Sequence, residues 1–580
     1  MTQKSSSTPS APHPLIIELL NKRGYTSTSQ IDDFFSWDLK RLPSLTSLTD
    51  LSCAVERIIK AISPPSIEKI AIYGDYDADG TTSCALLYHF FQLLEVEVVL
   101  MQPDRMQDGY GLHNSSIDQA GEMGVTLLIT VDCGITAHQQ CHYAKQVGID
   151  VIITDHHRDE LGAPTDAIAT INPNRQDELE SNSSLKSLAG VGVAFALALG
   201  IKERLEQDGK SLPSIYPLLQ FVAIGTICDL ANLNLVNRLL IRHGIKQLGQ
   251  SSFPGIVAFF TPEERKHAIP TEKLSFQIGP MINSKGRVDH PKDALLELIA
   301  KDAPTALHHH SLLKISNDQR KKLQREVVTS ARGLLEQEMT GNEQTISITY
   351  HPEWHEGVIG IVASKLVDAF KLPAIVLTDS SEQGVIKGSA RSAGELDLFA
   401  TLSKCSDLFI KFGGHKKAAG LSMKKENLSA FKQKMHEQLK EIPYSLRSVQ
   451  ESHDMEINFS DIGPKLVKDL DLLEPLGQGN EKPIFLLRNV RIASFDILKD
   501  LHVRWSFTPW ETNNAKSSNR PLPPLKGISF NYVGSWDQAH PQELYERQQR
   551  EQIGVSIYFT LGINRWNGGE YIQLMVKRVD

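Results

Sequence analysis

Residues 70–80 read Ile70-Ala71-Ile72-Tyr73-Gly74-Asp75-Tyr76-Asp77-Ala78-Asp79-Gly80 and decide the fold class. The apolar run predicts a buried strand, and the two glycines let the backbone turn beyond it. Three carboxylates then follow at every second position. Because acids this close repel one another, at least one would take up a proton unless a cation offsets the repulsion. Hard divalent ions prefer carboxylate oxygen, so the stretch predicts a metal site at a strand's carboxyl end.

Two other kinds of site would fit the same residues. A calcium loop of the EF-hand type would begin at Asp75 and place Leu86 at its twelfth position, where a bidentate glutamate is required. A phosphatase of the haloacid-dehalogenase type carries a signature like Asp77 to Thr81, but its strand normally runs straight into the first acid. Here Gly74-Asp75-Tyr76 intervenes. On this stretch alone, both alternatives stay open.

Polar side chains also follow later predicted strands. The predicted strands 97–101, 126–131 and 151–154 alternate with segments long enough for helices, which indicates a parallel sheet. Asp132 follows the second of these strands, and Asp155-His156-His157 follows the third. Ligands bind outside the carboxyl ends of parallel strands, so we expect these groups to meet the three acids of residues 75–79.

A further acid, Asp229, follows the apolar run 221–227, and we expect that run to deliver it to the same place in the manner of a strand. Oxygen ligands with one or two imidazoles suit paired Mn²⁺ or Mg²⁺ better than Zn²⁺. Two such ions about 4 Å apart are the usual arrangement for in-line displacement at phosphorus. The pattern therefore indicates a two-metal phosphoryl-transfer site.

Length and composition exclude several classes of protein. A chain of 580 residues should form about three or four domains. Its six cysteines include no CxxC pair and follow no secretory segment, so we expect neither disulfides nor structural zinc, and a cytoplasmic location. No apolar run approaches the roughly 20 residues needed to cross a membrane. The net charge of −8 argues against an all-over basic nucleic-acid binder but permits a local basic groove.

Three stretches together resemble the DHH phosphoesterase superfamily: Gly74 to Gly80, Val131-Asp132-Cys133-Gly134, and Asp155-His156-His157. More narrowly, residues 103–105, 109–112, 225–229 and 286–287 resemble the RecJ family of bacterial single-stranded-DNA exonucleases. Residues 354–363, 387–392 and 413–420 are similar to that family's second, DHH-associated (DHHA1) domain. The resemblance covers about residue 15 to the C-terminus, and it removes the calcium-loop and dehalogenase alternatives.

The resemblance implies a metal-dependent 5′→3′ exonuclease that degrades single-stranded DNA to 5′-mononucleotides in DNA repair and recombination. It also implies roles for particular residues. The ligands of two Mn²⁺ or Mg²⁺ ions would be Asp77, Asp79, Asp132, His156 and Asp229. The catalytic residues beside them would be Asp75 and His157. Substrate phosphates would be bound by Arg105, Arg287, Ser389, Arg391, Gly414 and His415.

Two other functions remain open. Another DHH phosphoesterase, acting on short oligonucleotides, would need the same acids but neither so long a chain nor a C-terminal barrel. A non-catalytic DNA-binding scaffold should have lost acids, and every expected ligand is present. As partners, the resemblance suggests single-stranded DNA, a single-strand-binding protein and a RecQ-type helicase.

We predict an α/β fold in five parts. Residues 1–14 are a disordered tail, and residues 15–300 form the parallel-sheet phosphoesterase domain with a helical preface. Apolar residues at helical spacing predict one long connecting helix within 301–343. Residues 344–447 form the smaller α/β DHHA1 domain. Short predicted strands in 448–580, such as 483–487, 490–495 and 555–561, indicate a β-barrel, which the resemblance makes OB-like. Candidate stacking residues are Trp505, Trp510 and Trp566, with core packing as the alternative for each. We also predict a flexible insertion at 510–527 and a hairpin turn at 567–569.

Overall fold

A computed structural model describes residues 11–65, 67–104, 109–288, 290–338, 344–450, 452–510, 522–533, 538–566 and 569–580. The chain forms two compact units. One, called here the phosphoesterase unit because it holds most of the predicted phosphoesterase domain, consists of residues 32–321 together with 474–481. The second unit holds residues 1–31, 322–473 and 482–580. The boundary at residue 321 falls inside the predicted connecting helix, which is observed as α14 (Ala303–Glu338).

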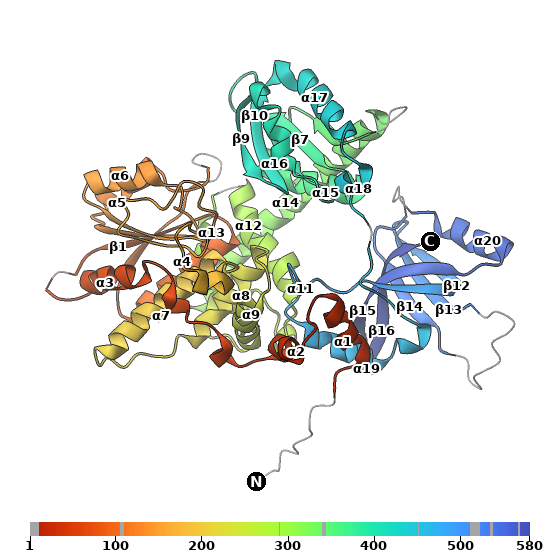
Figure 1. The fold of residues 1–580 in the computed structure, drawn as a ribbon, viewed down its shortest axis with the longest axis horizontal. Helices are drawn as coiled ribbons and strands as arrows, with labels where there is room; N and C mark the ends of the chain where they lie inside the picture. Colours follow the sequence, from red (N-terminus) through yellow and green to blue (C-terminus); the bar gives the residue numbers. More distant parts are fainter. Residues whose placement is uncertain are drawn as a thin grey trace, which may run out of the picture. The chain divides into compact units, whose positions relative to one another are not determined.

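A parallel five-stranded sheet organises the phosphoesterase unit. Its order is β2 (Val98–Met101), β1 (Ile70–Gly74), β3 (Leu127–Val131), β4 (Asp150–Thr154) and β5 (Ala169–Ile171). Ile70 and Ile72 pack with α3 (Leu51–Ala61), α4 (Ala78–Leu93) and α7 (Gly190–Gln207). Ala71 and Tyr73 pack on the other face with α5 (Asn114–Glu122) and α6 (His138–Gln146). Figure 1 shows α5 and α6 on one side of this sheet and α3 on the other. Both faces are covered, which explains why the strands are apolar throughout.

The four predicted strands are confirmed, and β5 is an addition. The expectation that a strand delivers Asp229 is wrong, because the apolar run before it lies in helix α8 (Leu219–Cys228). Residues 219–227 of this helix are all buried, so its sequence carries no amphipathic period. A short apolar run cannot be assigned to strand or helix by periodicity alone.

This unit contains six further α-helices among the described residues. They are α2 (Thr28–Phe35), which crosses the unit boundary, α9 (Leu235–Leu248), α10 (Pro254–Ala258), α11 (Thr271–Lys273), α12 (Gly279–Val288) and α13 (Lys292–Leu298). The sheet, α4, α8 and α12 are the elements that matter for the site described below.

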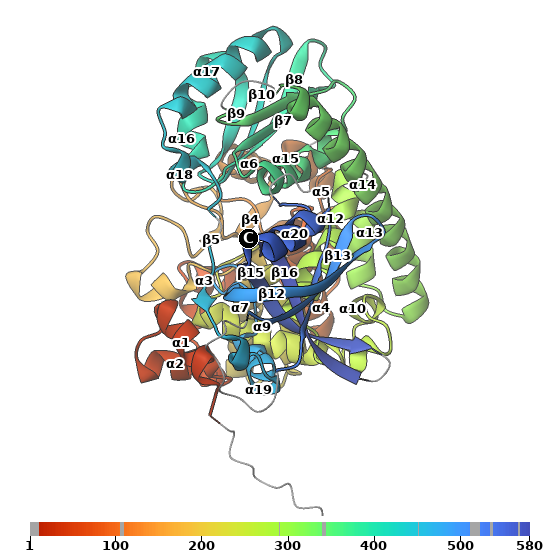
Figure 2. The ribbon, with the colours of Figure 1, turned by 90° about the vertical axis from the view of Figure 1, so that its right-hand side faces the viewer.

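The DHHA1 part of the second unit is a five-stranded sheet of order β6 (Ser347–Tyr350), β7 (Ala374–Asp379), β8 (Val385–Arg391), β10 (Ala418–Lys424) and β9 (Phe409–His415). Helix α15 (Glu356–Phe370) packs on Ala374 and Val376. The opposite face packs against α16 (Leu398–Ser403) and α17 (Leu428–Lys440). Figure 2 shows α15 and α17 on opposite sides of this sheet.

The C-terminal part is a closed five-stranded barrel. Its strands run β12 (Phe485–Leu498), β13 (His502–Pro509), β14 (Leu525–Ser529), β16 (Gly569–Val579) and β15 (Val555–Trp566), and β15 pairs back to β12. The short strand β11 (Met455–Glu456) pairs in parallel with the first residues of β12, and α20 (Pro541–Glu551) precedes β15. The α/β fold with an OB-like barrel is therefore confirmed.

Details of the barrel differ from the sequence expectation. The strands predicted at 483–487 and 490–495 are one strand, β12, with an irregularity near Asn489, whose φ is 54°. Trp505 is only 1% exposed and packs inside the barrel, so of its two predicted roles, stacking and core packing, the second is the one observed. Leu525 to Gly527, assigned to the flexible insertion, belong to β14. Residues 511–521 of that insertion, the turn residues 567–568 and the side chain of Trp566 lie outside the described residues.

The first helix, α1 (Pro14–Lys22), is grouped with the second unit, not with the phosphoesterase sheet. The backbone N–H of His13 donates to Asp469 at 2.8 Å, and Arg23 pairs with Asp454 at 3.0 Å. Residues 1–10 of the predicted tail lie outside the described residues. Short helices α18 (Tyr444–Arg447) and α19 (Pro464–Asp469) lie in the chain between the DHHA1 domain and the barrel.

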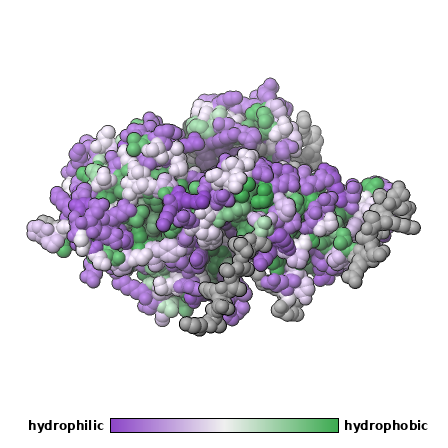
Figure 3. Space-filling model, turned by 60° about the horizontal axis from the view of Figure 1, so that its bottom comes forward, coloured by the Kyte–Doolittle hydropathy of each residue, from purple (hydrophilic) through white to green (hydrophobic). Residues whose placement is uncertain are grey.

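The surface shown in Figure 3 is mostly hydrophilic, and its apolar side chains occur in small separate groups. Among the described helices, none is both long enough and apolar enough to span a bilayer.

Candidate metal centre

The start of α4 fixes the acids of the turn that follows β1. Asp77 caps this helix, and its Oδ1 accepts hydrogen bonds from the backbone N–H groups of Asp79 at 2.9 Å and Gly80 at 3.1 Å. A Cβ at position 80 would lie 2.5 Å from the backbone oxygen of Asp75, so only glycine allows this close approach. The positive end of α4 therefore faces the acids and stabilises their charge.

Asp132 and His156 lie at the centre of the cluster. Asp132 follows β3 in a left-handed conformation, with φ of 60°. Its Oδ1 lies 3.1 Å from Nε2 of His156, and the same nitrogen lies 3.7 Å from Asp79 Oδ2 and 3.9 Å from Asp229 Oδ2. Neither Asp132 Oδ1 nor His156 Nε2 makes a hydrogen bond to another described residue, although both atoms are buried. Buried polar atoms normally have partners, so these two atoms fit metal ligands.

The N-terminus of α7 holds Asp79 from the opposite side. The backbone N–H groups of Gly190 and Val191 donate to its two carboxylate oxygens at 2.6 and 2.9 Å. A Cβ at position 190 would lie 2.7 Å from Cβ of Asp132 and 2.8 Å from its Oδ1. Glycine at 190 therefore lets one helix end approach two acids at once.

Asp155 orients the two histidines. It is fully buried, and it accepts hydrogen bonds from the backbone N–H groups of Ile135, His156 and His157. It also lies 2.8 Å from Nδ1 of His157, which the hydroxyl of Tyr110 approaches to 3.0 Å. Burial opposes ionisation of Asp155, but the His157 hydrogen bond and the histidine charges outweigh it and lower its pKa to about 2. Burial also opposes the charge of His157, but the hydrogen bond to Asp155 raises the pKa of this imidazole to about 9.

Asp79, Asp132 and Asp229 have pKa shifts in the opposite direction. Burial and then the charge of Asp77 raise the pKa of Asp79 to about 7, and burial with the charge of Asp79 raises that of Asp229 to about 9. The pKa of Asp132 is raised well above its usual range by burial and then by Asp79. Burial lowers the pKa of His156 to about 4, which keeps this imidazole neutral at pH 7 and able to bind a cation. The centre of the cluster thus combines carboxyl groups with a neutral imidazole, as a cation site should.

Three sets of ligand atoms lie within 4.8 Å of one another: Asp79 with His156 and Asp229; Asp75 with Asp77 and Asp132; and Asp132 with His156 and His157. The five residues predicted as metal ligands all occur in these sets, together with the two predicted catalytic residues. The oxygen-rich donors match Mn²⁺ or Mg²⁺, and the sets overlap at Asp132 and His156.

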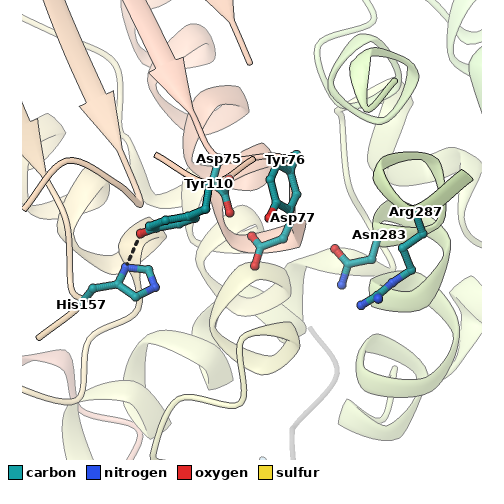
Figure 4. A pocket seen from close by; sticks show the side chains of 7 residues that line it. All are labelled: Asp75, Tyr76, Asp77, Tyr110, His157, Asn283 and Arg287. Atoms are coloured by element: carbon teal, nitrogen blue, oxygen red, sulfur yellow. Dashed lines mark hydrogen bonds between the residues drawn. The ribbon is translucent and has the colours of Figure 1, made fainter. Parts of the chain in front are cut away.

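A cavity of about 250 Å³ opens beside the acids (Figure 4). Tyr110 and His157 line one side of it, and Asn283 and Arg287, from α12, line the other. Arg287 was predicted as a phosphate-binding residue, and it lines the cavity that holds Asp75 and Asp77. A phosphate in this cavity would therefore meet acids on one wall and a guanidinium on another.

The other predicted substrate residues lie on the DHHA1 sheet. Ala418 of β10 lies opposite Arg391 of β8 on one side and opposite His415 of β9 on the other, so the side chains of these three residues share one face of the sheet. Arg391 also donates a hydrogen bond to Ser389 Oγ at 3.1 Å. Gly414 has φ of 150°, and a Cβ there would lie 2.4 Å from the oxygen of Ala418. Arg105 lies outside the described residues.

Asp155 was predicted at the site without a role there, and three further residues described above, Tyr110, Asn283 and Gly190, were not predicted. Asp155 and Tyr110 stand inside motifs that were recognised, but their partners are distant in sequence. Asn283 precedes Arg287 by one helical turn, a spacing that places both on one helix face. Gly190 carries no local signal, because its role depends on the approach of Asp132.

Family models match three parts of the chain: the DHH family N-terminal domain at residues 69–226, the DHHA1 domain at 343–441 and the RecJ OB domain at 453–578. The single-stranded-DNA-specific exonuclease RecJ of Bacillus subtilis strain 168 is 33% identical, and the alignment covers 97% of this chain and 67% of that protein. The protein of the same name from Escherichia coli K12 is 30% identical, and the alignment covers 98% of this chain and 96% of that protein.

Solved structures agree with these matches. RecJ from Thermus thermophilus in complex with Mn²⁺ superposes with a TM-score of 0.74 at 26% identity, covering 96% of this chain and 74% of that one. A second exonuclease RecJ bound to manganese gives a TM-score of 0.58 at 31% identity, covering 69% of this chain and 96% of that one.

The pKa shifts predict how metal removal changes stability with pH. Carboxyl groups in unfolded chains have pKa values near 4, so between about pH 7 and 9 the folded metal-free protein holds more protons than the unfolded chain. Its stability should fall as pH rises through this window, and loss of the proton from His157 acts in the same direction. Calorimetry in chelator should show a melting temperature that decreases from pH 7 to pH 9, and Mn²⁺ should raise it most at pH 9. A melting temperature in chelator that rises over this window would contradict the assignment.

Replacing Gly190 with alanine should displace Asp132, because the added Cβ would overlap its side chain. We expect Gly190→Ala to weaken Mn²⁺ binding about 10- to 100-fold, measured by titration calorimetry. The matched control is Gly121→Ala, whose Cβ would meet only Ile149 at an ordinary 3.7 Å. Equal Mn²⁺ affinity in the two folded variants would show that Gly190 is not needed at the site.

Proposed function

Since the chain belongs to the RecJ family of DHH phosphoesterases, we propose that it is a metal-dependent exonuclease that degrades single-stranded DNA from the 5′ end to 5′-mononucleotides. The observation that carries the proposal is the overlap of three ligand sets at Asp132 and His156. Two divalent ions bound there, Mn²⁺ or Mg²⁺, would polarise the scissile phosphate and activate the attacking water.

Particular residues of the chain would then have the following roles. Asp77, Asp79, Asp132, His156 and Asp229 hold the ions. Asp75 lies in one of the ligand sets and also lines the cavity, so it can orient both ligand and substrate. His157, fixed by Asp155, carries a proton at neutral pH and can donate a hydrogen bond to a phosphate oxygen.

Arg287 offers charge-assisted hydrogen bonds to the substrate phosphate from the opposite wall of the cavity. One face of the DHHA1 sheet, in the second unit, supports binding of the DNA backbone. Ser389, Arg391 and His415 share this face with Gly413 and Gly420, where a Cβ would meet no atom of the described residues within 4 Å. Small residues beside cationic ones leave room for a phosphate backbone to approach the sheet.

Other functions are less well supported. All the acids expected of an active enzyme are present and grouped, which argues against a scaffold. The closed barrel at the C-terminus suits a long single strand better than a short oligonucleotide. We further propose a cytoplasmic location, a role in DNA repair and recombination, and a single-strand-binding protein and a RecQ-type helicase as partners.

The cavity predicts strand selectivity. Its volume of about 250 Å³ lies below that of pockets for drug-sized ligands, so it has no room for a base-paired duplex. Digestion of end-labelled substrates in Mn²⁺ should release mononucleotides from the 5′ label of a single strand and trim a 5′ overhang to the junction. Blunt duplex should resist. Equal degradation of blunt duplex and single strand, or release from the 3′ end first, would refute this specificity.

Replacing Asp132 with alanine should separate catalysis from binding. This residue belongs to two ligand sets, so its loss should reduce cleavage by several orders of magnitude, as measured by release of labelled nucleotides. Phosphate contacts from Arg287 and Arg391 remain, and removing a negative charge should not weaken attraction to a polyanion.

The Asp132→Ala protein should therefore still retard a single-stranded oligonucleotide at low salt. Circular dichroism controls for folding. Near-normal nuclease activity in this folded variant would show that the metal site has been placed wrongly.

A further inference from the structure

Residues 474–481, called here the 474–481 segment, belong to the phosphoesterase unit, although the residues before and after them in sequence belong to the second unit. Part of the connection between the DHHA1 domain and the barrel is thus built into the phosphoesterase unit. A connection needs no such attachment to join two domains.

Two arginines of α9, one turn apart, anchor the beginning of the segment. Arg238 is 2% exposed, lies 3.6 Å over the ring of Phe34, and donates to the backbone oxygen of Pro475 at 3.3 Å. Arg242 donates to the backbone oxygen of Glu474 from Nε at 3.1 Å and from Nη2 at 3.0 Å. Buried guanidinium groups are costly to leave without partners, so these contacts hold the segment firmly.

Thr271, which is completely buried, holds the same end through its hydroxyl group. The hydroxyl donates to Glu474 Oε2 at 2.6 Å, and it accepts a hydrogen bond from the backbone N–H of Leu476 at 3.0 Å. Asn480 closes the segment into a turn, because its side chain donates to the oxygen of Pro475 at 2.8 Å.

The far side of the segment contacts the loop 230–234, which joins α8 to α9. The backbone N–H of Leu233 donates to the oxygen of Gln478 at 2.9 Å. A Cβ on Gly477 would lie 3.0 Å from Leu233, and one on Gly479 would lie 2.8 Å from Nδ2 of Asn232. The segment therefore lies directly against this loop.

The loop follows Asp229, which belongs to one ligand set with Asp79 and His156. Leu230, the next residue, has φ of 60°, a conformation that non-glycine residues rarely adopt without support. Asn237 supplies support from the α9 side by donating to the oxygen of Asn232 at 2.8 Å. The 474–481 segment supports the loop from the other side. Without these two supports, Asp229 would lie at the end of α8, where the backbone can fray.

We propose that the 474–481 segment is a positioning element for Asp229, and so for the ion that Asp79, His156 and Asp229 bind. This role rests on the proposed two-metal function. Metal ligands must be held within about 0.5 Å of their productive positions, and the loop between the segment and Asn237 provides that restraint. The other ligand set, Asp75 with Asp77 and Asp132, is built from β1, α4 and β3 and should not depend on this loop.

The test uses Gly479→Ala in the full chain, with Gly209→Ala as the matched control. Both glycines have positive φ, 79° and 83°, so alanine strains both backbones alike, but only position 479 has a neighbour to displace. Mn²⁺ titration without DNA should show two sites in the wild type and in Gly209→Ala. In Gly479→Ala one site should weaken about 10- to 100-fold while the other is unchanged. Raising Mn²⁺ should restore its nuclease activity.

Thr271→Val is a milder second variant, which removes the hydroxyl that holds Glu474 and Leu476. It should weaken the same site to a smaller extent, and it decides the question if Gly479→Ala does not fold. Unchanged Mn²⁺ affinities in the folded variants, or equal weakening of both sites, would overturn the proposal. Failure of the proposed two-metal function is distinguishable, because the wild type itself would then not bind two Mn²⁺ ions.

Discussion

The repulsion among buried carboxylates is the constraint on which the rest of the phosphoesterase unit depends. A parallel sheet and two helix ends bring Asp79, Asp132 and Asp229 around one imidazole, and burial with mutual repulsion raises the pKa of each acid. Such an arrangement is stable only with protons or cations bound. The helix N-termini of α4 and α7 offset part of this cost, and divalent ions would offset the rest.

The close grouping of the acids also explains the positions of two glycines. Gly80 and Gly190 lie where backbone must approach an acid more closely than a Cβ would permit. The backbone N–H groups that hold Asp79 could not reach it from a bulkier helix end. Backbone donors of this kind are fixed by the fold, so they restrain the carboxylates without adding a side-chain cation that would compete with the metal.

Sequence patterns predicted the parts of the site that depend on local structure. An apolar strand followed by acids is a short-range signal, and β1, β3 and β4 end where the predicted ligands begin. The apolar run before Asp229 is a buried helix, and no local period distinguishes it from a strand. The roles of Asp155, Gly190 and the 474–481 segment depend on contacts between distant residues, which a single sequence does not contain. The place of Trp505 could not be predicted from the sequence, because aromatic residues suit both barrel cores and stacking platforms; the structure places it in the core.

The central claim is that the acids at the carboxyl ends of these strands bind two divalent ions that share Asp132. Anomalous diffraction at the manganese absorption edge, from crystals of the full chain grown with Mn²⁺, tests it most directly. The account predicts two peaks about 4 Å apart, both contacting Asp132, with Asp229 beside one of them. A single peak, or manganese bound away from Asp132, would contradict it.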